Sequence, residues 1–194
     1  NIDRKEAFAH YGLKEGLPTI LVVGGSLGTR TLNNMMKSWI VTLGGEAPVQ
    51  VVWQTGRYYE KEMREFFAHY PTKNISLVPF IDRMDYAYEI ADVVISRSGA
   101  CTVSELCLAK KPTLFVPSPN VAEDHQTKNA RALVDKDAAM MVSDAEAADC
   151  GISTALRMVA DESLLAKLSK NIAKLATPDA AERVADEILK QIKA

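Results

Sequence analysis

Short apolar runs alternate along the 194-residue chain with amphipathic segments of helical spacing. Runs of this length that are rich in β-branched residues are typical of buried parallel strands. The predicted strands span residues 19–23, 49–53, 75–78, 92–95 and 113–116, with 138–142 as a last edge strand. Predicted helices separate them at 29–39, 58–69, 85–90, 98–109 and 124–135. The alternation predicts βαβ units and therefore an α/β fold, a Rossmann-like parallel sheet flanked by helices.

Both ends of the chain depart from this alternation. From about residue 145 the pattern is helical only, with breaks near Asp161 and at Thr177–Pro178. The first residue is Asn rather than Met, and residues 1–16 have the character of a remnant of an interdomain connector. We therefore expect a piece of a longer protein, with one domain over residues 17–194.

Composition limits the classes of partner. Hydrophobic residues make up 47% of the chain, enough for a proper core, and the net charge is −2. No continuous basic face is evident, so we expect no nucleic-acid partner. No apolar run reaches the ~18–20 residues of a membrane span, and no signal peptide is visible. The three cysteines lack metal-ligand spacing, which predicts no metal site and favours a reducing cytosol.

The segment from Ser96 to Glu105 is the strongest candidate for chemistry. It follows a predicted strand and opens a helix at Ser98, so unpaired backbone N–H groups and the positive end of a helix dipole point to one place. A phosphate is the usual occupant of such a place. Ser98, Thr102 and Glu105 would share one stripe of this helix, with the carboxylate about 10 Å along the axis, within reach of ribose hydroxyls. Alternatively, Thr102 and Glu105 form a capping box.

Right-handed crossovers place the loops after the strands on one rim. In the first loop, Gly24–Gly28, the side chain of Ser26 could donate to a phosphate or cap the next helix, and the glycines could serve only close packing. It matches neither the dinucleotide fingerprint nor a P-loop. In a second loop, Phe80 and Ile81 could form a slot for a flat base, whose edge would pair with the main chain of Ile81. Alternatively, both side chains belong to the core.

The last rim segment is Asp124-His125-Gln126, which opens a helix after a proline-rich loop. Asp124 suits an N-cap position, and the amide of Gln126 can both donate to and accept from sugar hydroxyls. Polar residues are also ordinary in an exposed first turn. His125 has no evident orienting partner, so we do not assign it as a general base. With no Ser/His/Asp set and no carboxylate pair, we expect no catalytic residue in this chain.

Five motifs occur in order that together resemble the C-terminal half of the MurG family of bacterial peptidoglycan N-acetylglucosaminyltransferases. They are Gly24-Gly-Ser-Leu-Gly28 with Asn33, Phe80-Ile-Asp82, Ser98-Gly-Ala-Cys-Thr-Val-Ser-Glu105, Pro112 with Phe115-Val-Pro117, and Asp124-His-Gln126 with Asn129-Ala130. The resemblance runs from about Ile20 to the final helix, where Pro178-Asp-Ala180 with Glu182-Arg-Val184 also matches. It implies one half of a GT-B glycosyltransferase, in which two Rossmann-like domains face each other across a cleft.

The resemblance implies a UDP-GlcNAc site. Ile81 would pair with uracil through its backbone, the helix start at Ala100, Cys101 and Thr102 would take the diphosphate, and Glu105 the ribose hydroxyls. Gln126, with His125, would contact the GlcNAc hydroxyls, and Ser26 would lie near the phosphates. The implied binding residues are Ser26, Ile81, Ser98, Gly99, Ala100, Cys101, Thr102, Val103, Ser104, Glu105, His125 and Gln126. Two residues depart from the family pattern: Thr29 stands where Ala is usual, and His125 where some relatives carry a second Gln.

The implied reaction transfers GlcNAc, with inversion, from UDP-GlcNAc to the C4 hydroxyl of lipid-linked MurNAc-pentapeptide. It needs no cofactor and no metal, and takes place on the cytoplasmic face of the inner membrane, to which the full-length protein would bind peripherally. The acceptor loops, the proposed catalytic base and a Gly-Asn-Pro-Val-Arg motif of the family are absent from this chain. Alternatives are another UDP-sugar GT-B transferase or epimerase, a stand-alone binding subunit that needs a separate acceptor chain, and a nucleotide-binding fold with no sugar role.

Overall fold

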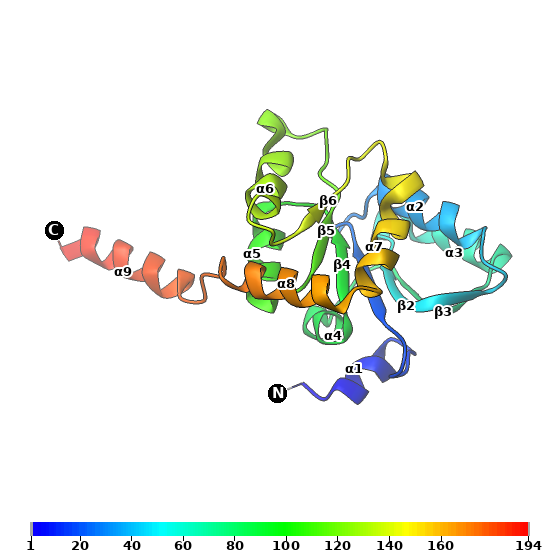
Figure 1. Ribbon diagram of the computed structural model, residues 1–194. Helices are drawn as coiled ribbons and strands as arrows, with labels where there is room; N and C mark the ends of the chain where they lie inside the picture. Colours follow the sequence, from blue (N-terminus) through cyan, green and yellow to red (C-terminus); the bar gives the residue numbers. More distant parts are fainter. Residues whose placement is uncertain (1, 194) are drawn as a thin grey trace.

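The computed structural model describes residues 2–193 and confirms the predicted parallel sheet (Figure 1). Its strands are β1 (Thr19–Val23), β2 (Glu46–Gln54), β3 (Lys73–Val78), β4 (Val93–Ser96), β5 (Thr113–Phe115) and β6 (Met140–Met141). They pair in the order β3-β2-β1-β4-β5-β6, and every pair is parallel. In the centre of the sheet, Leu21 lies opposite Val52 on one side and Val94 on the other.

Helices connect the strands and continue after the last one. They are α1 (Arg4–His10), α2 (Arg30–Ile40), α3 (Glu60–His69), α4 (Met84–Ile90), α5 (Ala100–Ala109), α6 (His125–Val134), α7 (Ile152–Val159), α8 (Glu162–Ala173) and α9 (Ala180–Lys193). Shorter helical turns are η1 (Arg57–Tyr59), η2 (Ala122–Asp124) and η3 (Ala147–Gly151). The break predicted near Asp161 is confirmed, because its carboxylate caps α8 by accepting from Leu164 N at 2.9 Å.

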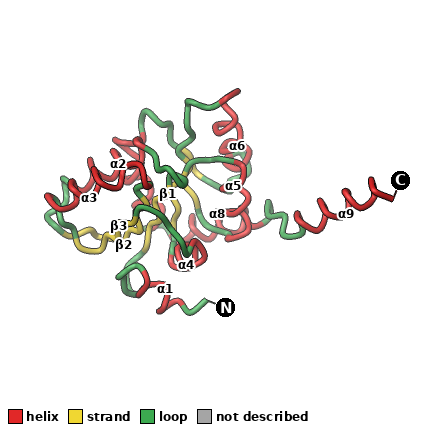
Figure 2. Tube along the Cα trace, turned by 180° about the vertical axis from the view of Figure 1, so that it is seen from behind, coloured by secondary structure: helices red, strands yellow, loops and turns green. Residues whose placement is uncertain are grey.

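The sheet separates two apolar cores, which explains why its central strands are continuous apolar runs. All five residues of β1 are buried. Leu21 and Val23 belong to the core beneath α1, α4, α5 and α6, whereas Ile20 and Val22 belong to the core beneath α2, α3 and α7. Figures 1 and 2 show these helices on opposite faces of the sheet.

The strand order creates a switch point between β1 and β4. From β1 the chain proceeds to one edge through β2 and β3, then returns to β4 on the other side of β1 and continues to β5 and β6. The loops that leave β1 and β4 therefore diverge to opposite faces and open a crevice at the carboxyl ends of the two strands. Open α/β sheets bind ligands at such a crevice.

The two ends of the chain behave differently. Residues 4–10, expected within the connector remnant, form α1, which buries Ala7 and Phe8 against α4. Just beyond it, the hydroxyl of Tyr11 donates to the carbonyl of Arg83 at 2.9 Å. By contrast, α9 projects away from the body of the domain (Figures 1 and 2). Residues 1 and 194, the outer ends of the two expected units, lie outside the described residues.

Within residues 2–193, no helix has both the length and the apolar character needed to cross a bilayer.

Candidate functional site

A cleft lies at the switch point, where the sequence places the candidate loops. Its larger part, of about 280 Å³, is lined by Val23, Gly24, Gly25, Met84, Tyr88, Ser96, Arg97, Gly99, Thr102, Glu105 and Gln126. A smaller part, of about 100 Å³, is lined by Val23, Gly25, Ser26, Gln54, Phe80, Ile81 and Met84. The two parts share Val23, Gly25 and Met84, so they form one depression with a wide end and a narrow end.

The first turn of α5 presents free amides at the wide end. Gly99 is the N-cap residue, and Val103 N makes the first helical bond, to Gly99 O. Among the described residues, nothing accepts from the N–H groups of Ala100, Cys101 or Thr102. These free donors and the positive end of the helix dipole lie where the sequence predicts an anion site.

The helix begins two residues later than predicted, which changes the role of Ser98. This residue precedes the helix and is fully buried. Its hydroxyl donates to the carbonyl of Gln126 at 2.8 Å, and its own carbonyl accepts from the side chain of Asn129 at 3.0 Å. The predicted stripe of Ser98, Thr102 and Glu105 is therefore wrong at its first member. Ser98 therefore joins the turn before α5 to α6, because one main-chain carbonyl of α6 satisfies its buried hydroxyl.

Glu105 lies on the cleft side of α5 with an exposed carboxylate. Because Gly99 caps the helix, the alternative of a capping box formed by Thr102 and Glu105 is wrong. Instead the carboxylate accepts a hydrogen bond from the hydroxyl of Tyr88 on α4 at 3.2 Å. Burial, with the negative charge of Glu105, raises the pKa of Tyr88 above its ordinary value, so the phenol stays a donor.

The other residues of α5 differ in where they lie. Gly99 and Thr102 line the cleft together with Glu105. Ala100 and Cys101 are exposed in the first turn. Val103 packs against the core, and Ser104 is exposed outside the residues that line the cleft. Only one face of this ten-residue segment is therefore available to a ligand in the cleft.

Close packing accounts for part of the glycine loop. A Cβ on Gly28, where φ is +79°, would lie 2.1 Å from the carbonyl oxygen of Thr55. Thr29 occupies the N-cap of α2, and its hydroxyl donates to Gly24 O at 3.0 Å. Ser26 is exposed and lines the narrow end, so it caps no helix. The packing alternative thus holds for Gly28, while Ser26 is free to face a ligand.

The side chains of Phe80 and Ile81 separate at the narrow end. Ile81 is 6% exposed and belongs to the core, whereas Phe80 is 41% exposed. The guanidinium of Arg57 lies over the Phe80 ring, 4.5 Å from its centroid. The core alternative therefore holds for the Ile81 side chain, and its main chain borders the slot next to the Phe80 ring.

The start of α6 brings only Gln126 into the cleft. Its side-chain carbonyl accepts from Ser118 N at 2.9 Å and from Ser98 N at 3.4 Å, which leaves the amide N–H₂ for a ligand. Asp124 occupies the N-cap in a left-handed conformation and makes no cap bond; its carboxylate accepts from the Thr127 hydroxyl at 2.6 Å. His125 is exposed, outside the residues that line the cleft, with Nδ1 2.9 Å from Ala122 O.

A family model described as the glycosyltransferase family 28 C-terminal domain matches residues 19–184, which contain the whole cleft. The chain belongs to this family. The match includes the six strands and excludes α1 and most of α9.

Named relatives support the assignment to family 28. The chain is 51% identical over 189 residues to the UDP-N-acetylglucosamine--N-acetylmuramyl-(pentapeptide) pyrophosphoryl-undecaprenol N-acetylglucosamine transferase of Parabacteroides distasonis, covering 97% of this chain and 51% of that protein. It is 47% identical over 193 residues to the protein of the same name from Bacteroides thetaiotaomicron, covering 99% of this chain and 52% of the relative. The chain thus spans about half the length of the curated relatives it matches.

Solved structures agree with the family 28 fold. The crystal structure of Acinetobacter baumannii MurG superposes with a TM-score of 0.77 at 31% identity, over 91% of this chain and 53% of that one. A UDP-GlcNAc 2-epimerase from Neisseria meningitidis, solved with UDP-GlcNAc bound, reaches 0.63 at 12% identity, over 96% of this chain and 47% of that one. The second match shows likeness of fold alone.

The family 28 cleft also contains residues that sequence reasoning missed: Gln54, Met84, Tyr88 and Arg97. Arg97 directly follows β4; it donates to the carbonyls of Val116 and Pro117 at 2.8 and 3.0 Å and pairs with Asp144. Position at the end of a predicted strand could have drawn attention to Gln54 and Arg97. Tyr88 gives no such signal, because it reaches Glu105 from a neighbouring helix.

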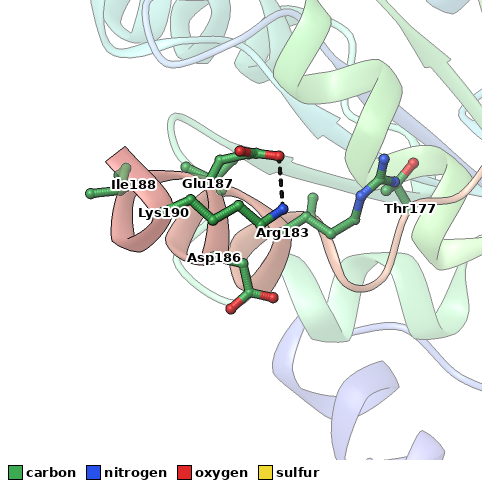
Figure 3. A pocket seen from close by; sticks show the side chains of 8 residues that line it. Thr177, Arg183, Asp186, Glu187, Ile188 and Lys190 are labelled. Carbon is green, nitrogen blue, oxygen red and sulfur yellow. Dashed lines mark hydrogen bonds and ion pairs between the residues drawn. The ribbon is translucent and has the colours of Figure 1, made fainter. Parts of the chain in front are cut away.

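A larger hollow, of about 550 Å³, lies along α9 (Figure 3). Its charged lining consists of Arg183, Asp186, Glu187 and Lys190, of which Lys190 pairs with Glu187 at 3.2 Å. No residue of the predicted site lines this hollow, so the chemistry of the family 28 domain is assigned to the smaller cleft. Within residues 2–193, no cluster of His, Cys, Asp and Glu side chains could hold a metal ion.

Proposed function

We propose that this chain binds UDP-GlcNAc as the donor half of an inverting glycosyltransferase. The whole protein would add GlcNAc to undecaprenyl-diphospho-MurNAc-pentapeptide, converting lipid I to lipid II in peptidoglycan synthesis. The observation that carries the proposal is that the free amides of the first α5 turn lie beside a cleft that also holds a carboxylate, Glu105, about one turn further along the same helix. The printed names of the relatives support the sugar and the lipid-linked acceptor.

In the proposed complex the donor lies along the cleft with its diphosphate at the wide end and its uracil at the narrow end. Its diphosphate would accept hydrogen bonds from the amides of Ala100, Cys101 and Thr102, and its ribose diol would donate to Glu105. Uracil would enter the narrow end beside the main chain of Ile81 and the Phe80 ring.

Other residues would contact the sugar and the side of the diphosphate that faces away from α5. GlcNAc would lie toward Gln126, whose amide N–H₂ is available, with His125 at the outer side of the same turn. Ser26 would approach the phosphates from the loop opposite α5.

The chemical contribution of this half is stabilisation of the leaving group. During transfer the C4 hydroxyl of the acceptor bonds to the sugar's anomeric carbon while the bond from that carbon to the UDP oxygen breaks. The hydroxyl proton passes to a base outside this chain. Negative charge grows on the departing diphosphate, where the α5 amides and a dipole of about half a unit charge stabilise it. We propose no catalytic residue within this chain.

The rest of the proposed protein supplies what this half does not. Residues 1–16 would lead from an acceptor-binding domain into the donor domain of residues 17–194. The undecaprenyl chain of the acceptor would place the whole protein peripherally on the cytoplasmic face of the inner membrane.

Calorimetric titration tests the proposal. Wild-type protein is expected to bind UDP, and 2′-deoxy-UDP about 10-fold more weakly, because a hydrogen bond to a charged group contributes about 1.5–3 kcal/mol. Glu105→Gln removes the charge, so UDP affinity should fall about 10-fold and the preference over 2′-deoxy-UDP should nearly vanish. Glu15→Gln, which alters an exposed carboxylate outside the cleft, serves as control. Absence of UDP binding at millimolar ligand, with an unchanged Tm, would contradict the proposal.

A further inference from the structure

Gln54 joins two walls of the cleft through one buried side chain. It ends β2 and is 3% exposed. Its Oε1 accepts from Gly24 N at 3.0 Å, in the glycine loop after β1. Its Nε2 donates to Gly25 O at 2.7 Å in the same loop and to Pro79 O at 3.4 Å, in the loop after β3. The amide orientation follows from these partners, since the N–H needs an acceptor and the two carbonyls need a donor.

The residues that follow Gln54 make further contacts with the same two loops. Thr55 N donates at 2.9 Å to the carbonyl of Val78, the last residue of β3 before the loop on the base side. Gly56 lies against the glycine loop so closely that a Cβ there would be 2.2 Å from Leu27 O. The guanidinium of Arg57 lies over Phe80. Segment 54–57 thus contacts the glycine loop through Gln54 and Gly56, and the loop after β3 through Gln54 and Arg57.

The two loops have no direct connection of this kind. Among residues 2–193, no hydrogen bond joins loop 24–28 directly to loop 79–83. The Gln54 side chain, which is hydrogen-bonded to both, therefore links the two loops directly. A nucleoside diphosphate bound as proposed would contact both loops, so its binding would depend on their separation as well as on each loop alone.

We propose that Gln54 is a positioning residue that fixes the spacing between the phosphate side and the base side of the cleft. The inference rests on the proposed function, because it takes a nucleoside diphosphate to be the ligand that spans both sides. Glutamine suits the role because one planar group accepts from one main-chain amide and donates to two carbonyls. A glutamate would place a carboxylate against Gly25 O and Pro79 O, where neither oxygen can donate.

The chain offers a matched control on the same strand. Gln50 is also 3% exposed, its Oε1 accepts from Lys14 N at 2.9 Å, and its Nε2 donates to Lys14 O at 2.6 Å. It lies at the opposite end of β2's pairing with β1, next to Thr19 rather than the cleft. Gln50→Glu therefore introduces the same buried change with no contact to either loop.

The test compares UDP with its two parts, uridine and pyrophosphate, by calorimetry. For Gln54→Glu we expect UDP affinity to fall about 10-fold or more, while each fragment loses less than about 3-fold, since a fragment needs only one loop. Gln50→Glu should leave all three affinities within about twofold even where it lowers the Tm. A role in stability alone would not separate UDP from its fragments.

A pH series supplies a second readout. Burial between carbonyl oxygens raises the pKa of a carboxyl group, and the protonated acid can donate as the amide does. The affinity ratio of wild type to Gln54→Glu should therefore shrink between about pH 8 and about pH 5.5. Gln54→Met, which keeps the length of the side chain without a charge, should show the same loss for UDP with no recovery at low pH. The methionine variant also keeps the test decisive if Gln54→Glu does not fold.

The possible failures are distinct. If wild type binds UDP and both Gln54 variants bind it within about twofold, the positioning role is overturned. An equal loss for UDP and both fragments would likewise overturn it. If folded wild type binds no UDP, the proposed function is what fails.

Discussion

At Gly99 the fold itself places no demand for glycine. The φ of Gly99 is −64°, which every residue adopts, and a Cβ built there meets no atom within 4 Å. Gly28 is the opposite case, because its positive φ and its close contact with Thr55 both require a residue without a side chain. The fold would accept alanine at Gly99, so the open space there is available to an anion approaching the α5 amides.

Gly99→Ala is expected to abolish or strongly weaken UDP binding while the free energy of unfolding stays within about 1 kcal/mol of wild type. The added methyl group would occupy the approach to the amides of Ala100 and Cys101. Gly44→Ala, also with nothing within 4 Å and no positive φ, is the control for substitution as such. Calorimetry and urea unfolding measure the two effects. Unchanged UDP affinity in Gly99→Ala would place the anion elsewhere.

At this scale, the sequence predicted main-chain roles better than side-chain contacts. The free amides of α5 follow from a strand, a turn and a helix in succession, and all three are local. Ser98 was misplaced because the helix start moved by two residues, and only contacts with α6 decide where its hydroxyl points. The bonds from Tyr88 to Glu105 and from Gln54 to Pro79 join residues distant in sequence, which no local pattern contains.

Among the elements, α5 and α9 represent two extremes. The first buries Leu106 and Cys107 in the core, and its exposed first turns border the cleft. The second is amphipathic, yet Val184, Ile188 and Leu189 are 51–61% exposed and no described side chain of α9 is buried. Amphipathic spacing predicted the helix correctly, but spacing alone does not say whether the apolar face is covered within this chain.

A chain that stops at residue 178 is expected to keep the Tm of the full chain within about 2 °C, because α9 buries no side chain of the fold. The truncation retains Leu175 and Ala176, which pack against the core. A chain that stops at residue 161 also loses Leu168 and Ile172 of α8, which are buried, and should be destabilised by several kcal/mol. Thermal unfolding followed by circular dichroism separates the two. A large drop for the first truncation would show that α9 supports the fold.

For the whole molecule, the strands and the helices that alternate with them were predictable, because each element is a local pattern. The packing of residues 4–10 against α4 was not. Composition marked residues 1–16 as a connector remnant, whereas α1 packs its apolar side against α4, next to the loop of Phe80 and Ile81. The helix α4, against which α1 packs, lies about seventy residues further along the chain. The hydrogen bond from Tyr11 to Arg83 likewise joins residues that are 72 positions apart.

Phe8→Ala is expected to lower the free energy of unfolding by about 3–5 kcal/mol, as for other buried aromatic residues. Tyr58→Ala, at a side chain 76% exposed, should change it by less than about 0.5 kcal/mol. Urea unfolding of both variants gives the comparison. Equal, small effects would mean that α1 is an attachment rather than part of the domain.

The position of β1 has a consequence for how this chain is made. The first strand of this domain to be synthesised, β1, lies at the centre of the finished sheet, and β2 and β3 pair along one of its sides. Its other side keeps open backbone donors and acceptors until β4 has been synthesised, and an unpaired apolar edge invites association with other chains. Nascent protein should therefore be most dependent on chaperones in the interval between completion of β3 and emergence of β4, before the cleft at the switch point has a second wall.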